Sequence, residues 1–326
     1  MHETCNGVNT VTMMTQYKER DFSVKPLVIG TRGSPLAVSQ AEETRDRLMK
    51  AHSMPASSFR MEIISTTGDK IQDRPLSEIG GKGLFTEEIE NLLIDGSIDI
   101  AVHSMKDMPT QLPTGLGITS ILPREDVRDS FVSRKYKSIK ELPVGATVGT
   151  SSLRRRAQLL AIRPDLKVIE FRGNVQTRLK KLDQGIADAT FLACAGLSRL
   201  NLKKLINPIP ISQMLPAVSQ GAIGIEQNLN NDLIREIVSV ITDKGSETQL
   251  EVERAFLLEL DGSCRTPIGG YAEILGEEIT FHGEILKPDG SETYKGIWKG
   301  ELSDATELGK SAAKVLKEKG GTAFFE

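Results

Sequence analysis

Arginines cluster after two short apolar runs of the chain, in segments that also contain glycine and a possible helix start. Residues 149–156 read Gly-Thr-Ser-Ser-Leu-Arg-Arg-Arg, and residues 171–178 add Arg172 and Arg178. Successive helical residues point about 100° apart, so at least one of the three consecutive arginines should face the interior and need a partner there. A solvated basic face explains each arginine alone, but five or six together, with Arg32 opposite, favour bidentate binding of carboxylate or phosphate. We therefore expect a polyanionic ligand in a cleft between two halves of the chain.

A candidate acid stands at the end of another apolar run. Residues 102–109 read Val-His-Ser-Met-Lys-Asp-Met-Pro, which places Lys106 directly before Asp107. Beside a group of arginines, this pair would be an acid with its charge partner, a combination suited to proton transfer. A salt bridge within a loop is the more common role for such a pair. We interpret His103 as a core histidine whose hydrogen bonds are satisfied.

Two glycine-containing loops are further candidates. Residues 30–35 read Gly-Thr-Arg-Gly-Ser-Pro, a strand end followed by a capped helix start whose free N–H groups suit an anion. An ordinary capped turn is the more common explanation of that pattern. Residues 80–83, Gly-Gly-Lys-Gly, lack the spacing of a nucleotide-binding phosphate loop. Their glycines indicate a mobile lid instead.

The three cysteines, Cys5, Cys194 and Cys264, are widely spaced and form no CxxC pair. The pattern predicts neither a disulfide scaffold nor a metal site. Cys194 is expected inside a strand as a small buried side chain. Cys264 lies in a Gly/Ser loop beside Arg265, where a cation favours the reactive thiolate, so both an inert and a reactive role stay open.

Apolar runs alternate with amphipathic segments from about residue 26, which predicts open α/β sheets with helices on both faces. Strands are expected at 27–30, 61–65, 98–103, 117–122, 146–148, 167–171 and 190–193, with a further apolar run at 222–227. Helices are expected at 34–51, 84–94, 153–163, 175–182, 195–205 and 232–241. The tail predicts a small α+β domain, with helices at 248–260 and 304–319 around strands at 271–275, 279–286 and 294–300. The predicted hairpin turn lies at 288–290.

Composition excludes several classes of protein. The formal net charge of −3 argues against binding nucleic acid through overall basicity. No apolar run approaches the roughly 18 to 20 residues of a membrane span, and the first 25 residues lack the pattern of a secretory signal. A cytoplasmic location is the default expectation.

Seven blocks, in the same order over nearly the whole chain from Leu27, resemble the porphobilinogen deaminase (hydroxymethylbilane synthase) family. They are Gly-Thr-Arg-Gly-Ser-Pro-Leu-Ala (30–37), Gly-Gly-Lys-Gly-Leu-Phe (80–85), His-Ser-Met-Lys-Asp (103–107), Gly-Thr-Ser-Ser-Leu-Arg-Arg (149–155), Arg-Gly-Asn-Val (172–175), Leu-Pro-Ala-Val-Ser-Gln-Gly-Ala (215–222) and Gly-Ser-Cys (262–264). The resemblance implies a transferase that condenses four porphobilinogen molecules head to tail, with loss of ammonia, to the linear tetrapyrrole hydroxymethylbilane. It also implies a dipyrromethane cofactor joined by a thioether to Cys264, and a monomer.

The implied fold is α/β, with two doubly wound, periplasmic-binding-protein-like domains flanking a cleft and a small C-terminal α+β domain. The expected division is a flexible extension at 1–25, a first domain at 26–122 with 218–242, a second at 123–217, and a third at 243–326 that carries Cys264. Fold alone also fits a solute-binding module of the periplasmic type. Such a module needs no reactive cysteine, and intact mass would separate the two functions.

The resemblance assigns roles residue by residue, without a metal. Asp107 matches the catalytic carboxylate. The residues implied to bind the cofactor are Cys264, Lys82, Lys106, Ser151, Ser152, Arg154 and Arg155. Those implied to bind substrate are Arg32, Ser34, Arg172, Arg178, Gln220 and Gly221. The sequence departs from the common family pattern at Val28, Thr67, Ser219 and Ser263, which affects the positioning of the chain rather than the reaction.

Overall fold

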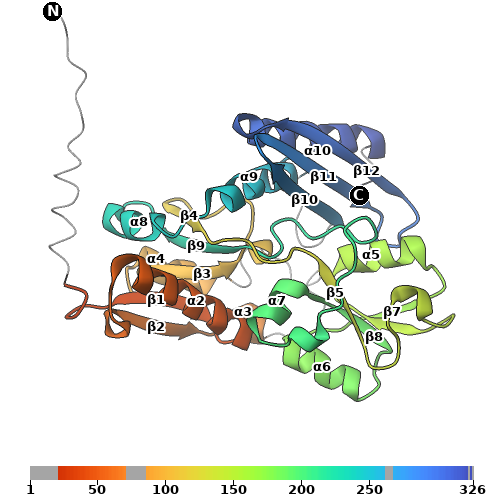
Figure 1. Cartoon of the computed structure of the whole chain (residues 1–326), viewed down its shortest axis with the longest axis horizontal. Coiled ribbons are helices and arrows are strands. Elements are labelled where there is room, and N and C mark those ends of the chain that lie inside the picture. The colour runs from red at the N-terminus through yellow and green to blue at the C-terminus, as the bar shows by residue number, and fades with distance from the viewer. Residues whose placement is uncertain (1–20, 71–85, 261–266, 322–323, 325–326) are drawn as a thin grey trace, which may run out of the picture.

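The computed structural model describes residues 21–70, 86–260, 267–321 and 324, and these residues form three β-sheets (Figure 1). Two predicted site residues, Lys82 and Cys264, lie outside the described residues, as does the predicted lid at 80–83. Phe22, within the predicted N-terminal extension, is buried against the core of the first sheet. In the described ranges, no helix has the length and apolar character needed to span a bilayer.

The first sheet has five strands in the order β2-β1-β3-β9-β4. In its centre, β1 (Leu27–Arg32) runs parallel to β2 (Phe59–Ile64) and to β3 (Ile100–Ser104). The late strand β9 (Ile223–Asn228) lies antiparallel between β3 and β4 (Leu116–Ile121). Strands β1 and β3 are buried along almost their whole length because both faces of the sheet are covered.

Helices cover both faces of this sheet. On one face, α2 (Pro35–His52) and α8 (Asp232–Ser239) pack against Leu27 and Ile29. On the other face, α4 (Glu87–Ile94) packs against Val28. The alternation of side chains along β1 therefore divides its residues between the two layers. A further short helix, α3, spans Thr67–Lys70.

The second sheet has four strands in the order β5-β8-β6-β7. Strand β6 (Thr147–Gly149) runs parallel to β7 (Lys167–Ile169) and β8 (Ala189–Ala193), and β5 (Asp129–Ser133) runs antiparallel to β8. The sequence analysis predicted no strand at 129–133. That segment begins with two buried polar residues, so its local pattern does not resemble an apolar strand.

Helices again cover both faces of the second sheet. One core cluster contains Leu159 of α5 (Leu153–Ile162), and the opposite cluster contains residues of α6 (Val175–Asp183) and α7 (Cys194–Arg199). The predicted helix at 195–205 is wrong in its length, because Asn201 adopts a left-handed conformation with φ of 57° just after α7. Cys194 is the first residue of α7 rather than part of a strand.

The C-terminal unit is an antiparallel sheet covered by two helices. Strands β10 (Ile268–Leu275), β11 (Glu278–Leu286) and β12 (Thr293–Glu301) form a meander. Helices α9 (Lys244–Glu259) and α10 (Ala305–Gly320) contribute to the single core cluster on one face of it. The predicted fold class, two α/β units and a small α+β unit, is confirmed.

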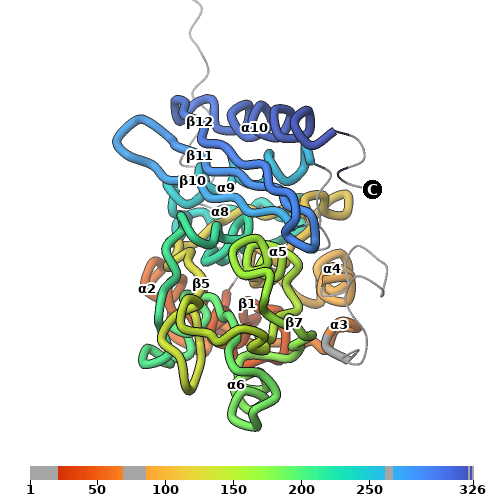
Figure 2. Tube along the Cα trace, turned by 90° about the vertical axis from the view of Figure 1, so that its right-hand side faces the viewer, coloured from red at the N-terminus to blue at the C-terminus, as the bar shows by residue number. Residues whose placement is uncertain are grey.

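The β11–β12 hairpin of the C-terminal unit lies against α5 of the second sheet, as both views show (Figures 1 and 2). Its predicted turn is confirmed: Gly290 has a φ of +75°, and its N–H donates to the carbonyl of Lys287. A Cβ at Gly290 would lie 2.5 Å from the backbone nitrogen of Ala161 and 2.6 Å from the carbonyl oxygen of Ala157. Only glycine allows this approach to the helix that carries the arginine run.

The chain crosses between the two α/β sheets twice, after β4 and again before β9. The two crossings lie side by side, because Leu122 donates to the carbonyl of Ile223 and Glu125 donates to that of Gly221. The domain limits given above stay a prediction. Short 3-10 turns complete the fold at Ala56–Ser58, Met105–Asp107, Ile139–Glu141, Lys203–Leu205 and Leu302–Asp304.

Candidate active site

The predicted loops lie at the carboxyl ends of parallel strands in both sheets. Arg32 ends β1 and Ser34 follows it, the Lys106–Asp107 turn follows β3, and the two arginine segments follow β6 and β7. Charges from both sheets act on one another here: the cations Arg155 and Arg172 and the anion Asp107 of the first sheet all act on Arg178. The structure therefore brings together residues that the sequence places far apart.

The buried Met105 anchors the turn that contains Lys106 and Asp107. Met105 is buried, its N–H donates to the carbonyl of Ala222, and the N–H of Met108 closes the turn by donating to the carbonyl of Met105. A Cβ at Gly224 would overlap the sulfur of Met105, so the neighbouring strand must carry glycine there. The two residues that follow, Lys106 and Asp107, are exposed to solvent at the surface of the site.

Lys106 points towards the second crossing, where its Nζ donates to Oε1 of Gln220 over 3.3 Å. The side chain keeps access to water yet lies among many protein atoms. The resulting desolvation lowers the pKa of Lys106 to about 8; Asp107 opposes this shift, and Arg155 adds to it. Lys106 is therefore a cation whose charge depends on its surroundings near neutral pH.

Asp107 lines a small cavity of about 70 Å³ together with Arg32, Ser34, Thr86 and His103. A larger cavity, of about 510 Å³, lies beside the two crossings and Tyr271 and contains none of the predicted site residues. We place the site at the smaller cavity, because it contains the acid and lies at the strand ends.

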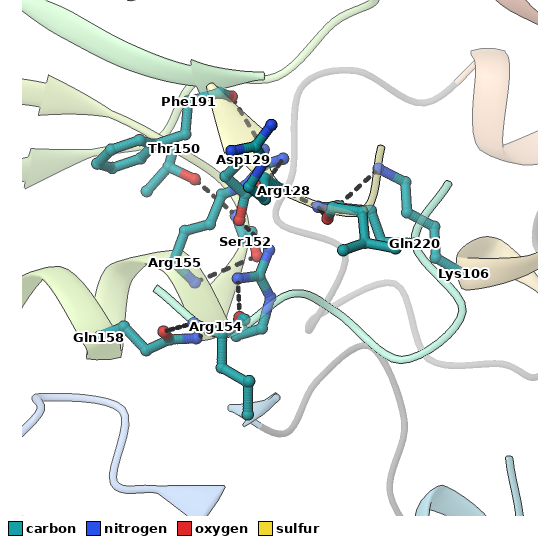
Figure 3. A network of polar contacts seen from close by, with 12 residues as sticks. Lys106, Arg128, Asp129, Thr150, Ser152, Arg154, Arg155, Gln158, Phe191 and Gln220 are labelled. Carbon is teal, nitrogen blue, oxygen red and sulfur yellow. Dashed lines mark hydrogen bonds and ion pairs between the residues drawn. The ribbon is translucent and has the colours of Figure 1, made fainter. Parts of the chain in front are cut away.

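Arg154 and Arg155 are buried and bind an acid that the sequence analysis did not identify, Asp129 at the start of β5 (Figure 3). Nη2 of Arg154 lies 2.8 Å from Oδ2 of Asp129, and Nη2 of Arg155 lies 2.6 Å from Oδ1. Their Nη1 groups donate to the carbonyls of Leu215 and Phe191, respectively. Although burial acts to raise it, these two guanidinium groups hold the pKa of Asp129 below its ordinary value.

This internal pairing changes what the two arginines can offer to a ligand. Arg155 uses Nε, Nη1 and Nη2 within the protein. Nε of Arg154 is buried without a hydrogen-bond partner among the described residues. Buried arginine normally requires a partner, so a counterion was foreseeable. No local pattern points to Asp129, which lies 25 residues before Arg154.

Ser34, Ser151 and Ser152 all use their hydroxyl groups within the fold. Ser34 caps α2 by accepting from the N–H of Ala37, as its position before Pro35 predicts. Ser152 caps α5 by accepting from the N–H of Arg155, and Ser151 accepts from the N–H of Phe171. Ser151 thereby joins the two arginine-bearing loops of the second sheet.

The loop after β7 contains Arg172, and Arg178 lies in the helix that follows it. Nε of Arg178 donates to the carbonyl of Gly173, whose φ of +116° lets the backbone turn towards the guanidinium. Desolvation lowers the pKa of Arg178 to about 10, with a contribution from Arg155 that Asp107 opposes. Both arginines are partly exposed, unlike Arg154 and Arg155.

Gln220 and Gly221 lie on the second crossing, at the junction of the units. Gln220 is buried, and its Nε2 donates to Oδ1 of Asp129 and to the carbonyl of Val127. Gly221 has a φ of +90°, and its carbonyl accepts from Arg199 over 3.1 Å. Ser219 has a φ of +62°, which explains why glycine would be favoured at that position.

Two residues to which the resemblance gives no role are buried, as interpreted. His103 is buried, and its Nε2 lies 2.9 Å from Oε2 of the buried Glu226. Cys194 is also buried, and desolvation raises the pKa of its thiol to about 12, which keeps it protonated and unreactive. In the described part of the chain, no group of three or more His, Cys, Asp or Glu residues is placed to hold a metal ion.

Comparison with known proteins identifies the family. The family model "Porphobilinogen deaminase, dipyromethane cofactor binding domain" matches residues 27–236, and its C-terminal domain model matches residues 248–318. The porphobilinogen deaminase of Paracoccus denitrificans is 55% identical over 302 residues, 92% of this chain and 96% of that protein. That of Nitrobacter winogradskyi is 53% identical over 298 residues, 91% of this chain and 94% of that protein.

Similarity to solved structures is more distant. An ABC transporter periplasmic substrate-binding protein from Coxiella burnetii aligns with a TM-score of 0.42 at 13% identity, covering 66% of this chain and 91% of that one. At this level the likeness identifies no ligand. The two family models and the curated relatives decide the matter: the chain belongs to the porphobilinogen deaminase family.

Proposed function

We propose that this chain condenses four porphobilinogen molecules head to tail, releasing ammonia at each step, to give hydroxymethylbilane. One observation supports this assignment above the others: Asp107 of the first sheet lies among the charges that act on Arg178, with Arg155 and Arg172, of the second. An acid surrounded by cations suits a substrate that carries two carboxylates and loses an amine. A reversible solute-binding module, the alternative, is not favoured by the family.

The dipyrromethane cofactor that the family implies fits the charges of this site. The charges that act on one another here are five cations and three carboxylates: Lys106, Arg154, Arg155, Arg172 and Arg178 against Asp107, Asp129 and Glu170. Nε of Arg154 adds a buried donor without a partner in the described residues. Such an excess of positive charge is expensive unless anions compensate it. A chain of pyrroles, each with an acetate and a propionate, supplies those anions.

The proposed binding roles follow the sequence resemblance. Cofactor contacts are assigned to Lys82, Lys106, Ser151, Ser152, Arg154 and Arg155, with the thioether at Cys264. Substrate contacts are assigned to Arg32, Ser34, Arg172, Arg178, Gln220 and Gly221. The geometry adds a distinction within these sets. The exposed Lys106 and the half-buried Arg172 and Arg178 can meet carboxylates directly, whereas Arg155 and the serine hydroxyls act by holding the loops in place.

Each addition replaces a C–N bond by a C–C bond. The nitrogen of the aminomethyl group, in its protonated form, departs as ammonia with the bonding electrons of the C–N bond. The pyrrole carbon that forms the new bond loses a proton, and the ammonia takes up one proton to leave as ammonium. When bound, the cofactor supplies the pyrrole end to which the first unit is added. We assign the proton transfer to the carboxylate of Asp107. While ionised, the same carboxylate stabilises the positive charge that develops as the amine departs.

The proposal also covers the oligomeric state, location and partners of the enzyme. We infer a monomer in the cytoplasm with porphobilinogen as its small-molecule partner and without nucleic acid or membrane partners. The net charge of −3 and the family resemblance support these inferences.

Intact mass of the purified protein tests the proposal directly. The parent should exceed its sequence mass by two pyrrole units, and Cys264→Ala should fold, carry no added mass and be inactive. Cys194→Ala is the matched control: it removes a buried thiol outside the site and should keep the added mass. Added mass on Cys264→Ala would show that the attachment site is wrong. A parent without added mass, and without ammonia release from porphobilinogen, would favour a binding module.

A further inference from the structure

Asp129 occupies the centre of the polar network in Figure 3. It is completely buried, and its two carboxylate oxygens accept from three side chains, those of Arg154, Arg155 and Gln220. The first two belong to α5, whereas Gln220 belongs to the crossing that leads back to the first sheet. One carboxylate thus connects the second sheet to the junction between the units.

The contacts of Gln220 determine which way its amide points. Its Nε2 donates to Oδ1 of Asp129 over 3.0 Å and to the carbonyl oxygen of Val127 over 2.7 Å. Both partners are pure acceptors, so only the NH₂ group can face them. Oε1 must therefore face the opposite way, where it accepts from Nζ of Lys106 over 3.3 Å. The backbone of Gln220 is held as well, because Nε of Arg124 donates to its carbonyl over 2.9 Å.

We propose that Asp129 is a positioning residue of the reaction: through the amide of Gln220 it fixes the direction of Lys106 beside Asp107. This inference rests on the proposed function. A lysine side chain has a flexible stem of four carbons, so an exposed ammonium needs a fixed acceptor to hold one direction. The series of hydrogen bonds that links Asp129, Gln220 and Lys106 supplies that acceptor from a buried and rigid position.

The charged groups around Lys106 predict the sign of a pH effect. Asp107, on the same turn, and Asp129, on β5, favour its charged form, whereas Arg154 and Arg155 on α5 disfavour it. Removing the charge of Asp129 therefore lowers the pKa of Lys106 below its present value of about 8. If the lysine must be charged, activity is lost at a lower pH in such a variant. Removing the amide oxygen that accepts from Lys106 shifts the pKa in the same direction.

The experiment compares Asp129→Asn, Gln220→Met and the double variant with the parent, using holoenzyme whose intact mass shows two pyrrole units. The measurements are kcat and KM for porphobilinogen across pH. Asp165→Asn is the matched control, because Asp165 also binds an arginine, Arg163, through both oxygens over 2.6 and 2.7 Å, but stands away from the site.

We expect each single variant to lower kcat by about tenfold to a hundredfold, the range of one charge-assisted hydrogen bond. We also expect the alkaline limb of the profile of kcat against pH to move to lower pH. The double variant should lose little more than Asp129→Asn alone, because both changes break one chain of contacts. Asp165→Asn should keep the parental kcat and pH profile.

Two results would overturn the inference. One is a Gln220→Met enzyme with the parental kcat and alkaline limb, which is decisive even if Asp129→Asn does not fold. The other is a double variant whose losses multiply, since Asp129 would then serve only to balance the charge of the arginines. A parent without the added pyrrole mass would instead refute the proposed function itself.

Discussion

Glu253 of α9 is a buried carboxylate that joins the C-terminal unit to the crossings, and we predict that Glu253→Gln strongly destabilises this junction. Its side chain is fully buried, and that of Arg124 is 5% exposed. Oε1 accepts from Nη1 of Arg124 over 2.7 Å and from the N–H of Ala272 over 2.8 Å. Oε2 accepts from Nη2 of Arg124 over 3.0 Å and from the N–H of Ser219 over 2.6 Å.

The magnitude follows from this arrangement of donors. Whichever oxygen becomes the NH₂ group of glutamine, that group faces one guanidinium N–H and one backbone N–H, and neither can accept a hydrogen bond. A lost charge-assisted hydrogen bond costs about 1.5 to 3 kcal/mol, and an unpaired buried backbone N–H costs about 1 to 3 kcal/mol. We therefore expect the free energy of unfolding to fall by about 3 to 5 kcal/mol, the range found when one member of a buried ion pair is removed.

Urea unfolding followed by tryptophan fluorescence measures this loss. The chain has one tryptophan, Trp298, which lies in β12 with its ring 6.2 Å from that of Phe281, so its emission reports on the C-terminal unit. The matched control is Glu278→Gln in β11, in the same sheet as Trp298. Glu278 pairs with Lys299 over 2.6 Å, but both side chains are more than half exposed, so we expect a change below about 1 kcal/mol. Equal effects of the two substitutions would refute the argument from buried donors.

The remaining predictions concern Asp107 and the positive φ of Ser219. Asp107→Asn should keep the cofactor when supplied with preassembled tetrapyrrole but lose about a thousandfold in single-turnover ammonia release, and Asp107→Glu should retain more activity than the asparagine variant. Turnover of Asp107→Asn within about tenfold of the parent would make Asp107 a structural partner of Lys106. Ser219→Gly should raise the free energy of unfolding in urea by about 1 kcal/mol, because it relieves a positive φ and removes a buried hydroxyl without a partner among the described residues. A decrease in stability would show that the loop is not strained.

Local signals predicted much of the fold. The start of α2 is given by Ser34 and Pro35, and the predicted cap accepts from the N–H of Ala37. The helix expected from residue 153 begins there, with Ser152 as its cap. Apolar runs located β1, β3 and β8 because these strands are covered on both faces. Strand β5 escaped prediction because Asp129 and Ser130 are buried polar residues whose partners come from distant segments.

The sequence identifies candidate cations and a candidate acid, whose roles stay a prediction, but it does not identify their partners. Arginine and lysine segments after apolar runs are visible in the sequence, and in the structure the charges of Asp107 and Arg155 both act on Lys106 and on Arg178. The sequence could not show that Arg154 and Arg155 already bind an internal acid. Such pairing depends on the packing of β5 against β8, and side-chain geometry of that kind leaves no periodic pattern.

The position of β9 in the first sheet affects the order in which the chain can fold during synthesis. Among the described residues, the second sheet has its four strands once Ala193 has been made, whereas β4 pairs with β9 alone and has no strand partner until the segment ending at Asn228 appears. Until then β3 and β4 both present unpaired edges, which favour association with other chains. A ribosome that pauses between these two points would hold a completed second sheet beside an unfinished first one. We expect the nascent chain to be prone to aggregation during this interval of synthesis.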